Sequence, residues 1–184
     1  MSIPRSERLS FSIPSTWDAE PIPDAERVEF VFAPNEMGLA IDIRSPYYDE
    51  PMPRVPVGPC WGLWEFEVVE IFVAGRDGAY TEIELGPHGH HLILRFKEPR
   101  RPWAQELPLD YRASIQHSLW SGKALVPWSY LPPAPHRINL YAIHGLGAGR
   151  RYLALQPVPG EQPDFHQLDF FKAISFGKDA DGCL

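Results

Sequence analysis

The chain has 184 residues, of which 44% are hydrophobic, as expected for one large globular domain or a small pair of domains. Its net charge is −7 and its longest basic cluster is the short stretch EPRRPW at 98–103, which argues against binding to nucleic acid or to an anionic membrane surface. No apolar run approaches the ~20 residues of a membrane helix, and no secretory signal pattern is visible.

Short strand patterns follow one another from the N-terminus, separated by turn residues and by proline-rich segments. One helical turn is predicted at 127–131, where Pro127 suits a first-turn position. The pattern predicts an all-β fold, a single antiparallel β-sandwich or jelly roll, covering 1–184 with its core at about 9–176 and a short flexible tail at 177–184. The predicted strands are 9–13, 27–33, 38–44, 65–74, 80–85, 90–96, 111–118, 122–126, 138–145, 150–156 and 173–176.

The segment 65–96 is predicted to form three antiparallel strands joined by the turns GRDG (75–78) and GPHG (86–89). Centring the hairpins on these turns pairs Glu70 with Ile83 and Glu84 with His91. Glu70 then points into an apolar core face and needs a partner, because an unpaired buried carboxylate is costly. The candidate partners are His90, His144 and Arg151.

A β-bulge at Val68–Val69 is the alternative arrangement. It would restore the parity of the strand and place Glu65, Glu67 and Glu70 together on the ligand face. We prefer the straight strand, because it gives both hairpins one consistent apolar face.

The other face of this meander is predicted to be polar, and two interpretations remain open for it. Its side chains could form a concave platform that binds ligand hydroxyls, or cross-strand pairs such as Glu84–His91 and Tyr80–Arg95 could stabilise a solvated face. Apolar residues on the same face favour partial cover or a ligand. The candidate ligand-binding residues there are Glu67, Tyr80, Glu82, Glu84, His91 and Arg95.

Two tryptophans in loops next to this face, Trp64 and Trp103, are candidates for stacking on the apolar side of a sugar. A second group of polar residues is expected to be structural, forming a hydrogen-bonded clasp between loops or the rim of a pocket. That group comprises Glu70, His144, Arg151, Asp164 and His166.

No metal site, cofactor or catalytic centre is predicted. The cluster PHGHH (88–91) is poorly suited to a metal, since His90 and His91 point to opposite faces of a strand. No GxSxG elbow is present, and Cys60 lacks a neighbouring base. Two cysteines, Cys60 and Cys183, and no signal pattern indicate a cytoplasmic protein with free thiols.

Several motifs, in this order, resemble those of family nine carbohydrate-binding modules, which belong to a wider DOMON-like group of β-sandwiches. The resemblance covers about 15–176, and the chain is more closely similar to a small intracellular family of no assigned function. The resemblance to the carbohydrate-binding modules implies a β-sandwich with a ligand-sized concave face or end pocket. The motifs are WEFEVVEIFV, YTEIELGPHGHHLILRF, GKALVPWSYLPP and PDFHQLDFFKAISF.

The function that follows is non-catalytic binding of a carbohydrate or another polyhydroxylated small molecule. One alternative is an enzyme, such as a glycosidase, using paired carboxylates, with Glu82 or Glu84 opposite Glu67 or Glu70. A second alternative is a scaffold that presents its sheet face to another protein.

Overall fold

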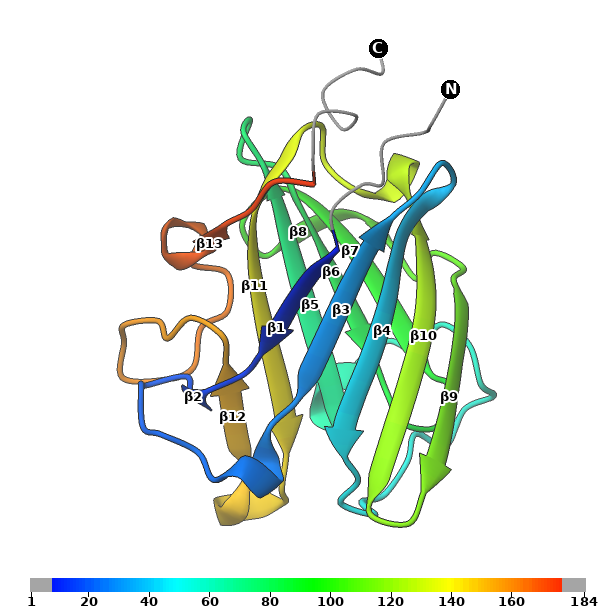
Figure 1. The fold of residues 1–184 in the computed structure, drawn as a ribbon, viewed down its shortest axis with the longest axis vertical. Coiled ribbons are helices and arrows are strands. Elements are labelled where there is room, and N and C mark those ends of the chain that lie inside the picture. The colour runs from blue at the N-terminus through cyan, green and yellow to red at the C-terminus, as the bar shows by residue number, and fades with distance from the viewer. Residues whose placement is uncertain (1–7, 177–184) are drawn as a thin grey trace.

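The computed structural model describes residues 8–176, which form two antiparallel sheets packed face to face, as the sequence predicts (Figure 1). The predicted flexible tail at 177–184 lies outside the described residues. Within the described part, helical structure is limited to 3-10 turns, and none of it is long and apolar enough to cross a membrane. These turns are Asp24–Glu26, Leu63–Glu65, Trp128–Tyr130, Gly147–Gly149 and Leu168–Phe170.

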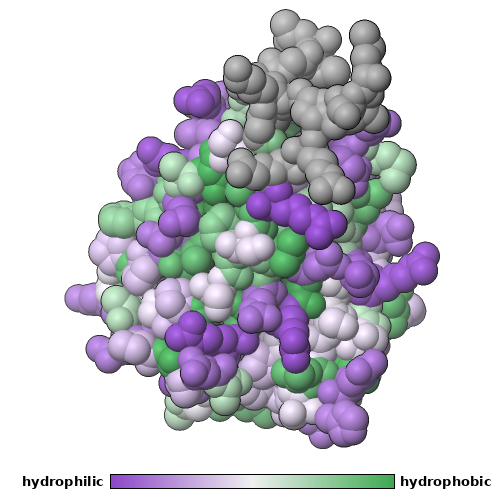
Figure 2. Space-filling model, in the orientation of Figure 1, coloured by the Kyte–Doolittle hydropathy of each residue, from purple (hydrophilic) through white to green (hydrophobic). Residues whose placement is uncertain are grey.

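The five-stranded sheet has the order β1-β3-β4-β10-β9 and lies at the front in Figure 1. Along β4, buried and exposed positions alternate, which is the pattern of a sheet with one face in the core and one in water. Figure 2 shows hydrophilic side chains interspersed with hydrophobic ones on this outer face, where Lys123 forms a salt bridge with Asp42. Its strands are β1 (Leu9–Ser12), β3 (Glu29–Pro34), β4 (Gly38–Pro46), β9 (Asp110–Gln116) and β10 (Leu119–Pro127).

The eight-stranded sheet has the order β2-β12-β11-β5-β6-β7-β8, and β13 also pairs with β11. Its strands are β2 (Ser15–Thr16), β5 (Val68–Gly75), β6 (Tyr80–Leu85), β7 (His91–Glu98), β8 (Arg101–Gln105), β11 (Pro135–His144), β12 (Arg151–Ala154) and β13 (Lys172–Ala173).

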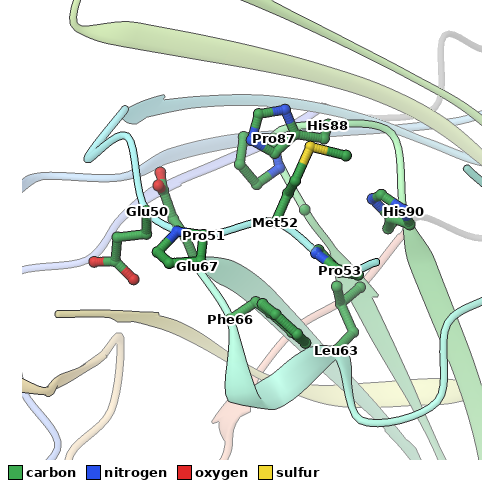
Figure 3. Close-up of a pocket in the computed structure, with 11 residues that line it drawn as sticks. Glu50, Pro51, Met52, Pro53, Leu63, Phe66, Glu67, Pro87, His88 and His90 are labelled. Atoms are coloured by element: carbon green, nitrogen blue, oxygen red, sulfur yellow. The ribbon is translucent and has the colours of Figure 1, made fainter. Parts of the chain in front are cut away.

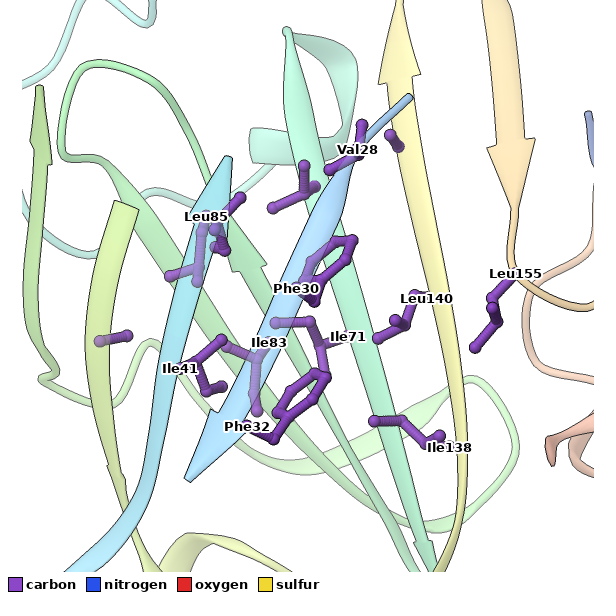
Figure 4. Packing of buried hydrophobic residues seen from close by; sticks show 14 of the residues in the cluster. Val28, Phe30, Phe32, Ile41, Ile71, Ile83, Leu85, Ile138, Leu140 and Leu155 are labelled. Carbon is purple, nitrogen blue, oxygen red and sulfur yellow. The ribbon is translucent and has the colours of Figure 1, made fainter. Parts of the chain in front are cut away.

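The main hydrophobic core fills the space between the two sheets (Figure 4). Phe30, Phe32 and Ile41 of the five-stranded sheet point toward Ile71 and Ile83 of the eight-stranded sheet, and all five are almost fully buried. Burial of side chains this large contributes roughly 2–3 kcal/mol each, so this core is the main source of stability.

Every residue of β5 and β6 is buried, so these two central strands are covered on both faces. A second apolar cluster, which includes Phe72, Tyr80, Leu94, Phe96 and Tyr141, lies on the face of the sheet turned away from the main core. Partly buried rings from loops, among them Trp64 and Phe165, pack against it. Loops therefore cover this outer face, where an ordinary sandwich would meet solvent.

The pairing of β5, β6 and β7 differs by one residue from the prediction. Glu70 pairs with Glu84 instead of Ile83, and Leu85 pairs with His91 instead of His90. Each hairpin closes through a three-residue turn that ends in a glycine with positive φ, Gly78 or Gly89, and not through a symmetric four-residue turn. A slip of one residue moves every side chain of a strand to the opposite face.

Most of the predicted strands are confirmed, as is the single turn at Trp128–Tyr130. Three assignments were wrong. The strand predicted at 173–176 is limited to the two-residue strand Lys172–Ala173. The strand predicted from residue 65 begins at Val68, after the 3-10 turn Leu63–Glu65, and the proline-rich segment assigned to a loop contains the edge strand β8. Pro102 is tolerated there because an edge strand leaves one side of its backbone unpaired.

Candidate functional site

A cleft of about 800 Å³ lies on the loop-covered face of the eight-stranded sheet. Its floor is formed by side chains that alternate toward this face: Glu70 and Phe72 from β5, Glu82 from β6, and Leu94 and Phe96 from β7. The walls come from loops far apart in sequence, namely 61–65, 146–150 and 163–166, with Arg100 and Pro102 also lining the cleft. This volume is in the range of small-molecule binding sites.

Three carboxyl groups meet at the floor of the cleft. Glu70 and Glu84 are direct cross-strand partners, and Glu82 lies two residues from Glu84 on the same face of β6. One oxygen from each lies within 4.8 Å of the others, and all three side chains are buried. Within the described part of the chain, no N–H or hydroxyl group donates a hydrogen bond to either oxygen of Glu84 or to Oε2 of Glu82. The carboxyl groups of Glu82 and Glu84 share a side-chain hydrogen bond with each other.

Burial makes these carboxyl groups weak acids. Desolvation raises the pKa of Glu82 to about 8. The pKa of Glu70 is raised well above its ordinary value by burial and by the charge of Glu82, while Arg150 opposes the shift. Burial and the charges of Glu70 and Glu82 raise the pKa of Glu84 in the same direction. The group therefore retains protons near neutral pH unless a cation replaces them.

Arg150 brings a positive charge to this end of the cleft. Its guanidinium donates hydrogen bonds to the backbone carbonyls of Trp64 (2.7 Å), Phe66 (3.3 Å) and Gly145 (3.1 Å). These carbonyls fix the position of the guanidinium without neutralising it, so its charge can act on Glu70 and on a ligand.

A polar network lines another part of the cleft. The hydroxyl of Tyr80 accepts a hydrogen bond from the backbone N–H of Arg100 (3.2 Å) and lies 2.8 Å from Nδ1 of His166. Burial and the charge of Arg100 lower the pKa of His166 to about 4, so the ring is neutral. A hydroxyl that donates to Nδ1 leaves Nε2 as the donor nitrogen. Arg100 also forms an ion pair with Asp164.

Aromatic rings form much of the wall. Trp61 and Trp64 pack edge to face with their centroids 5.1 Å apart, and Trp61 is 53% exposed. On another part of the wall, the ring of Phe165 stacks on that of Tyr141, with their centroids 3.7 Å apart. Phe165 also packs edge to face against Tyr152, with a centroid distance of 6.2 Å. Aromatic walls above carboxyl and guanidinium groups suit a ligand that has both an apolar face and several hydroxyl groups.

The structure divides the predicted ligand-binding residues into three sets. Trp64 and Glu82 line the cleft, while Tyr80 and Glu84 lie directly beside its lining groups. His91 and Arg95 alternate with Leu92 and Leu94 along β7, so they face the other side of the sheet. Their predicted placement on one polar face with Glu82 and Glu84 is wrong, because the actual register is shifted by one residue.

Trp103 also lies away from the cleft. It is 52% exposed, and the guanidinium of Arg95 lies 4.4 Å from its ring centroid, a cation–π contact. Neither predicted cross-strand pair forms, because Tyr80 pairs with Phe96 and Glu84 pairs with Leu92.

Glu67 belongs to a separate small cavity of about 10 Å³ under the loop 50–53 (Figure 3). Its two oxygens accept the backbone N–H of Tyr48 at 3.3 and 3.2 Å. Burial raises its pKa to about 7. Since Glu65 lies in a 3-10 turn and Glu67 precedes β5, the β-bulge that would gather Glu65, Glu67 and Glu70 does not form.

The residues predicted to be structural also separate into two places. Asp164 and His166 line the cleft beside Glu70. His144 and Arg151 lie around Glu26 instead: Arg151 forms a 2.8 Å salt bridge with it, and His144 Nε2 lies 3.9 Å from it. Glu70 is buried, as predicted, but its predicted partners are wrong, and so is its predicted face, because it points into the cleft with Glu82 while Val69 and Ile71 point into the main core.

Sequence reasoning missed several residues of the cleft. Trp61, Arg100, Arg150, Tyr152 and Phe165 all line it, and none was a candidate. The run GLGAGRR at 145–151 was available as a signal, because a glycine-rich turn followed by two arginines is unusual in a plain hairpin. Nothing in the sequence, however, indicates that this turn faces the loop 163–166.

Comparisons with known proteins give relatives and a fold. The "UPF0462 protein C4orf33 homolog" of Danio rerio is 43% identical over 173 residues, which cover 89% of this chain and 87% of that protein. The human "UPF0462 protein C4orf33" is 42% identical over 177 residues, covering 91% and 88%. No protein-family model matches the chain.

A solved structure supports the sandwich independently. It is described as a "putative carbohydrate-binding protein" from Bacteroides uniformis and superposes with a TM-score of 0.70, covering 90% of this chain and 84% of that one. At 17% identity, this similarity concerns the fold.

Proposed function

The chain belongs to the UPF0462 family, and we propose that it is a non-catalytic binding protein whose cleft holds a carbohydrate or another polyhydroxylated small molecule. The observation that carries the proposal is the cleft itself, in which aromatic walls stand over buried carboxyl groups and a fixed arginine. The structural neighbour from Bacteroides uniformis, named for carbohydrate binding, supports the same ligand class. The proposal includes the cytoplasmic location expected from the sequence.

The roles of the lining residues follow from their chemistry. Trp61 and Trp64 would stack on the apolar face of a sugar ring. Glu70, Glu82 and Arg150 would accept from and donate to its hydroxyl groups, and His166 would add a donor through Nε2. Each such hydrogen bond discriminates against a ligand that lacks the hydroxyl, because the buried protein group would be left unpaired.

Isothermal titration of the purified protein with glucose, galactose, mannose, cellobiose and maltose tests the proposal. We expect at least one sugar to bind, and we expect Trp64→Ala to weaken that binding about tenfold, which corresponds to about 1.4 kcal/mol of lost stacking. Trp103→Ala is the matched control, since this tryptophan lies on the opposite side of the sheet.

Two results would contradict the proposal: no binding of any sugar in the panel, or an equal loss in Trp64→Ala and Trp103→Ala. Analysis of the sugars after titration separates the enzyme alternative. Cleavage of cellobiose or maltose by the wild-type protein, lost in Glu82→Gln, would assign a glycosidase that uses the carboxyl groups of the cleft.

A further inference from the structure

The carboxyl group of Glu84 has no role in the binding proposed above. Glu70 and Glu82 line the cleft, but Glu84 is 0% exposed, and neither of its oxygens accepts a hydrogen bond from an N–H or hydroxyl group in the described part of the chain. Its side-chain hydrogen bond is with the neighbouring carboxyl group of Glu82, which requires that one of the two carries a proton. A buried carboxyl group with no donor costs stability, so such a residue usually serves something other than packing. One carboxyl oxygen of Glu84 lies within 4.8 Å of a carboxyl oxygen of Glu70 and of one of Glu82.

We propose that Glu70, Glu82 and Glu84 bind one divalent cation of the oxygen-preferring class, with Ca²⁺ as its representative, at the floor of the cleft. All three ligands would be hard carboxylate oxygens, which Ca²⁺, Mg²⁺ and Mn²⁺ prefer and which softer metals do not require. Among residues 8–176, these three form the group of carboxylate, histidine and cysteine side chains whose spacing suits one ion.

The spacing of the oxygens is compatible with Ca²⁺. Two oxygens bound to one ion can be separated by at most twice the metal–oxygen distance, which is about 4.6–5.2 Å for Ca²⁺ and about 4.0–4.2 Å for Mg²⁺. Oxygens that lie within 4.8 Å of one another can therefore surround Ca²⁺ without movement of the backbone. Because Glu70 and Glu84 are paired on adjacent central strands, the sheet holds them in place.

The local charges also balance with a divalent ion. Three ionised carboxylates carry three negative charges, the ion supplies two positive charges, and Arg150 supplies the third. The charge of Arg150 acts on Glu70, and its guanidinium donates hydrogen bonds to the backbone carbonyls of Trp64, Phe66 and Gly145, which carry no net charge. A neutral assembly of this kind can remain buried, whereas three bare carboxylates cannot.

The cleft provides the route for the ion and its remaining ligands. Glu70 and Glu82 line the open space, so water molecules could complete the coordination shell from that side. The thiol of Cys60 is close enough for its charge to act on Glu84. Its sulfur is not, however, among the ligand atoms that lie close enough together to bind the same ion, which come from Glu70, Glu82 and Glu84. The site is therefore expected to prefer Ca²⁺ over Zn²⁺.

The test uses the full chain, freed of metal by chelation and dialysis, at pH 8 and without any sugar. Ca²⁺ is titrated by calorimetry, and Mn²⁺ is titrated by the loss of its free electron-paramagnetic-resonance signal. We expect one ion per chain, with at least tenfold weaker binding in Glu84→Gln and in Glu70→Gln. Glu67→Gln is the matched control, since it also neutralises a buried carboxyl group but lies in another cavity.

Glutamine keeps the shape of glutamate, and the melting temperature of chelated Glu84→Gln, expected to equal or exceed that of chelated wild type, verifies that the variant folds. Addition of Ca²⁺ should then raise the melting temperature of wild type and of Glu67→Gln but not of Glu84→Gln. The proposal is overturned if wild type binds neither ion, or if Glu67→Gln loses as much affinity as Glu84→Gln. Because no sugar is present, failure here leaves the sugar-binding proposal to its own titration.

Discussion

Glu67 and Glu82 are both buried carboxyl residues, yet their surroundings differ. Glu67 accepts the backbone N–H of Tyr48 with both oxygens, whereas Oε2 of Glu82 accepts from no N–H or hydroxyl group in the part of the chain described by the structure. The backbone donor lowers the pKa of Glu67, but desolvation outweighs it, and the pKa remains at about 7. Glu67 is therefore a structural residue whose charge state depends on pH near neutrality.

Glu67 gives a prediction about stability and pH. Its pKa is about 7 in the folded chain, against an ordinary value of 4.5. Between pH 4.5 and pH 7, the folded state therefore binds the proton more tightly than the unfolded state does. The stabilisation that the protonated group contributes is complete below about pH 4.5 and is lost as pH rises to about 7. As pH rises through this window, the free energy of unfolding of Glu67→Gln should therefore increase by up to about 3 kcal/mol relative to that of wild type.

Urea unfolding of both proteins at pH 5 and pH 8 measures this difference. Glu65→Gln serves as the control, because Glu65 is exposed and lies only two residues away. A difference between Glu67→Gln and wild type that stays constant between the two pH values would contradict the prediction.

At the scale of elements, strand existence could be predicted from sequence and strand register could not. Alternation of polar and apolar residues located most strands, including β4, where buried and exposed positions alternate. β5 and β6 are both buried on both faces. β6 still alternates, with Glu82 and Glu84 opposite Ile83 and Leu85, but the almost continuous apolar run of β5 carries no alternation that fixes which of its faces meets the main core. The register then depended on turn length, and GRDG and GPHG allow both three- and four-residue turns.

The same error explains what could be predicted of the candidate site. Glu82, Trp64, Asp164 and His166 were identified by residue type and position. The grouping of Glu82 with Glu70 was missed, because a slip of one residue placed Glu70 on the other face. The loops that form the walls meet only through the tertiary fold, so no local pattern in the sequence could have joined them.

The loop 145–150 gives a prediction at this scale, because it holds Arg150 against the cleft. Gly145 has φ +84°, and a Cβ there would lie 2.2 Å from the carbonyl oxygen of Gly149. Gly147 has φ +54° but open space around its Cβ. Both alanine variants incur the cost of a left-handed backbone, about 1–2 kcal/mol, but only Gly145→Ala adds a backbone clash.

We therefore expect Gly145→Ala to destabilise the protein by roughly 2–3 kcal/mol more than Gly147→Ala. Since the carbonyl of Gly145 accepts a hydrogen bond from Arg150, the same variant should also weaken ligand binding in the cleft. Thermal unfolding and sugar titration of the two variants provide the comparison. Equal stability of the two variants would show that the loop relaxes freely and does not fix Arg150.

At the scale of the whole molecule, the two sheets are assembled from interleaved parts of the chain. The five-stranded sheet takes β1, β3, β4, β9 and β10, while the eight-stranded sheet takes the strands between and after them. The short strand β2, near the N-terminus, pairs with β12, near the C-terminal end of the described region. No single cut of residues 8–176 separates one sheet from the other.

This arrangement predicts that the chain unfolds as one cooperative unit, because neither sheet retains its core when the other opens. Calorimetry should give one transition with equal calorimetric and van't Hoff enthalpies, of about 130 kcal/mol near 60 °C for 184 residues. Urea unfolding followed by tryptophan fluorescence, which reports on Trp61 and Trp64 as well as on buried Trp120, should coincide with far-ultraviolet circular dichroism. A fluorescence change that precedes the loss of strand signal would show instead that the loops over the cleft open independently of the sandwich, and the cleft would then be a separately folding layer.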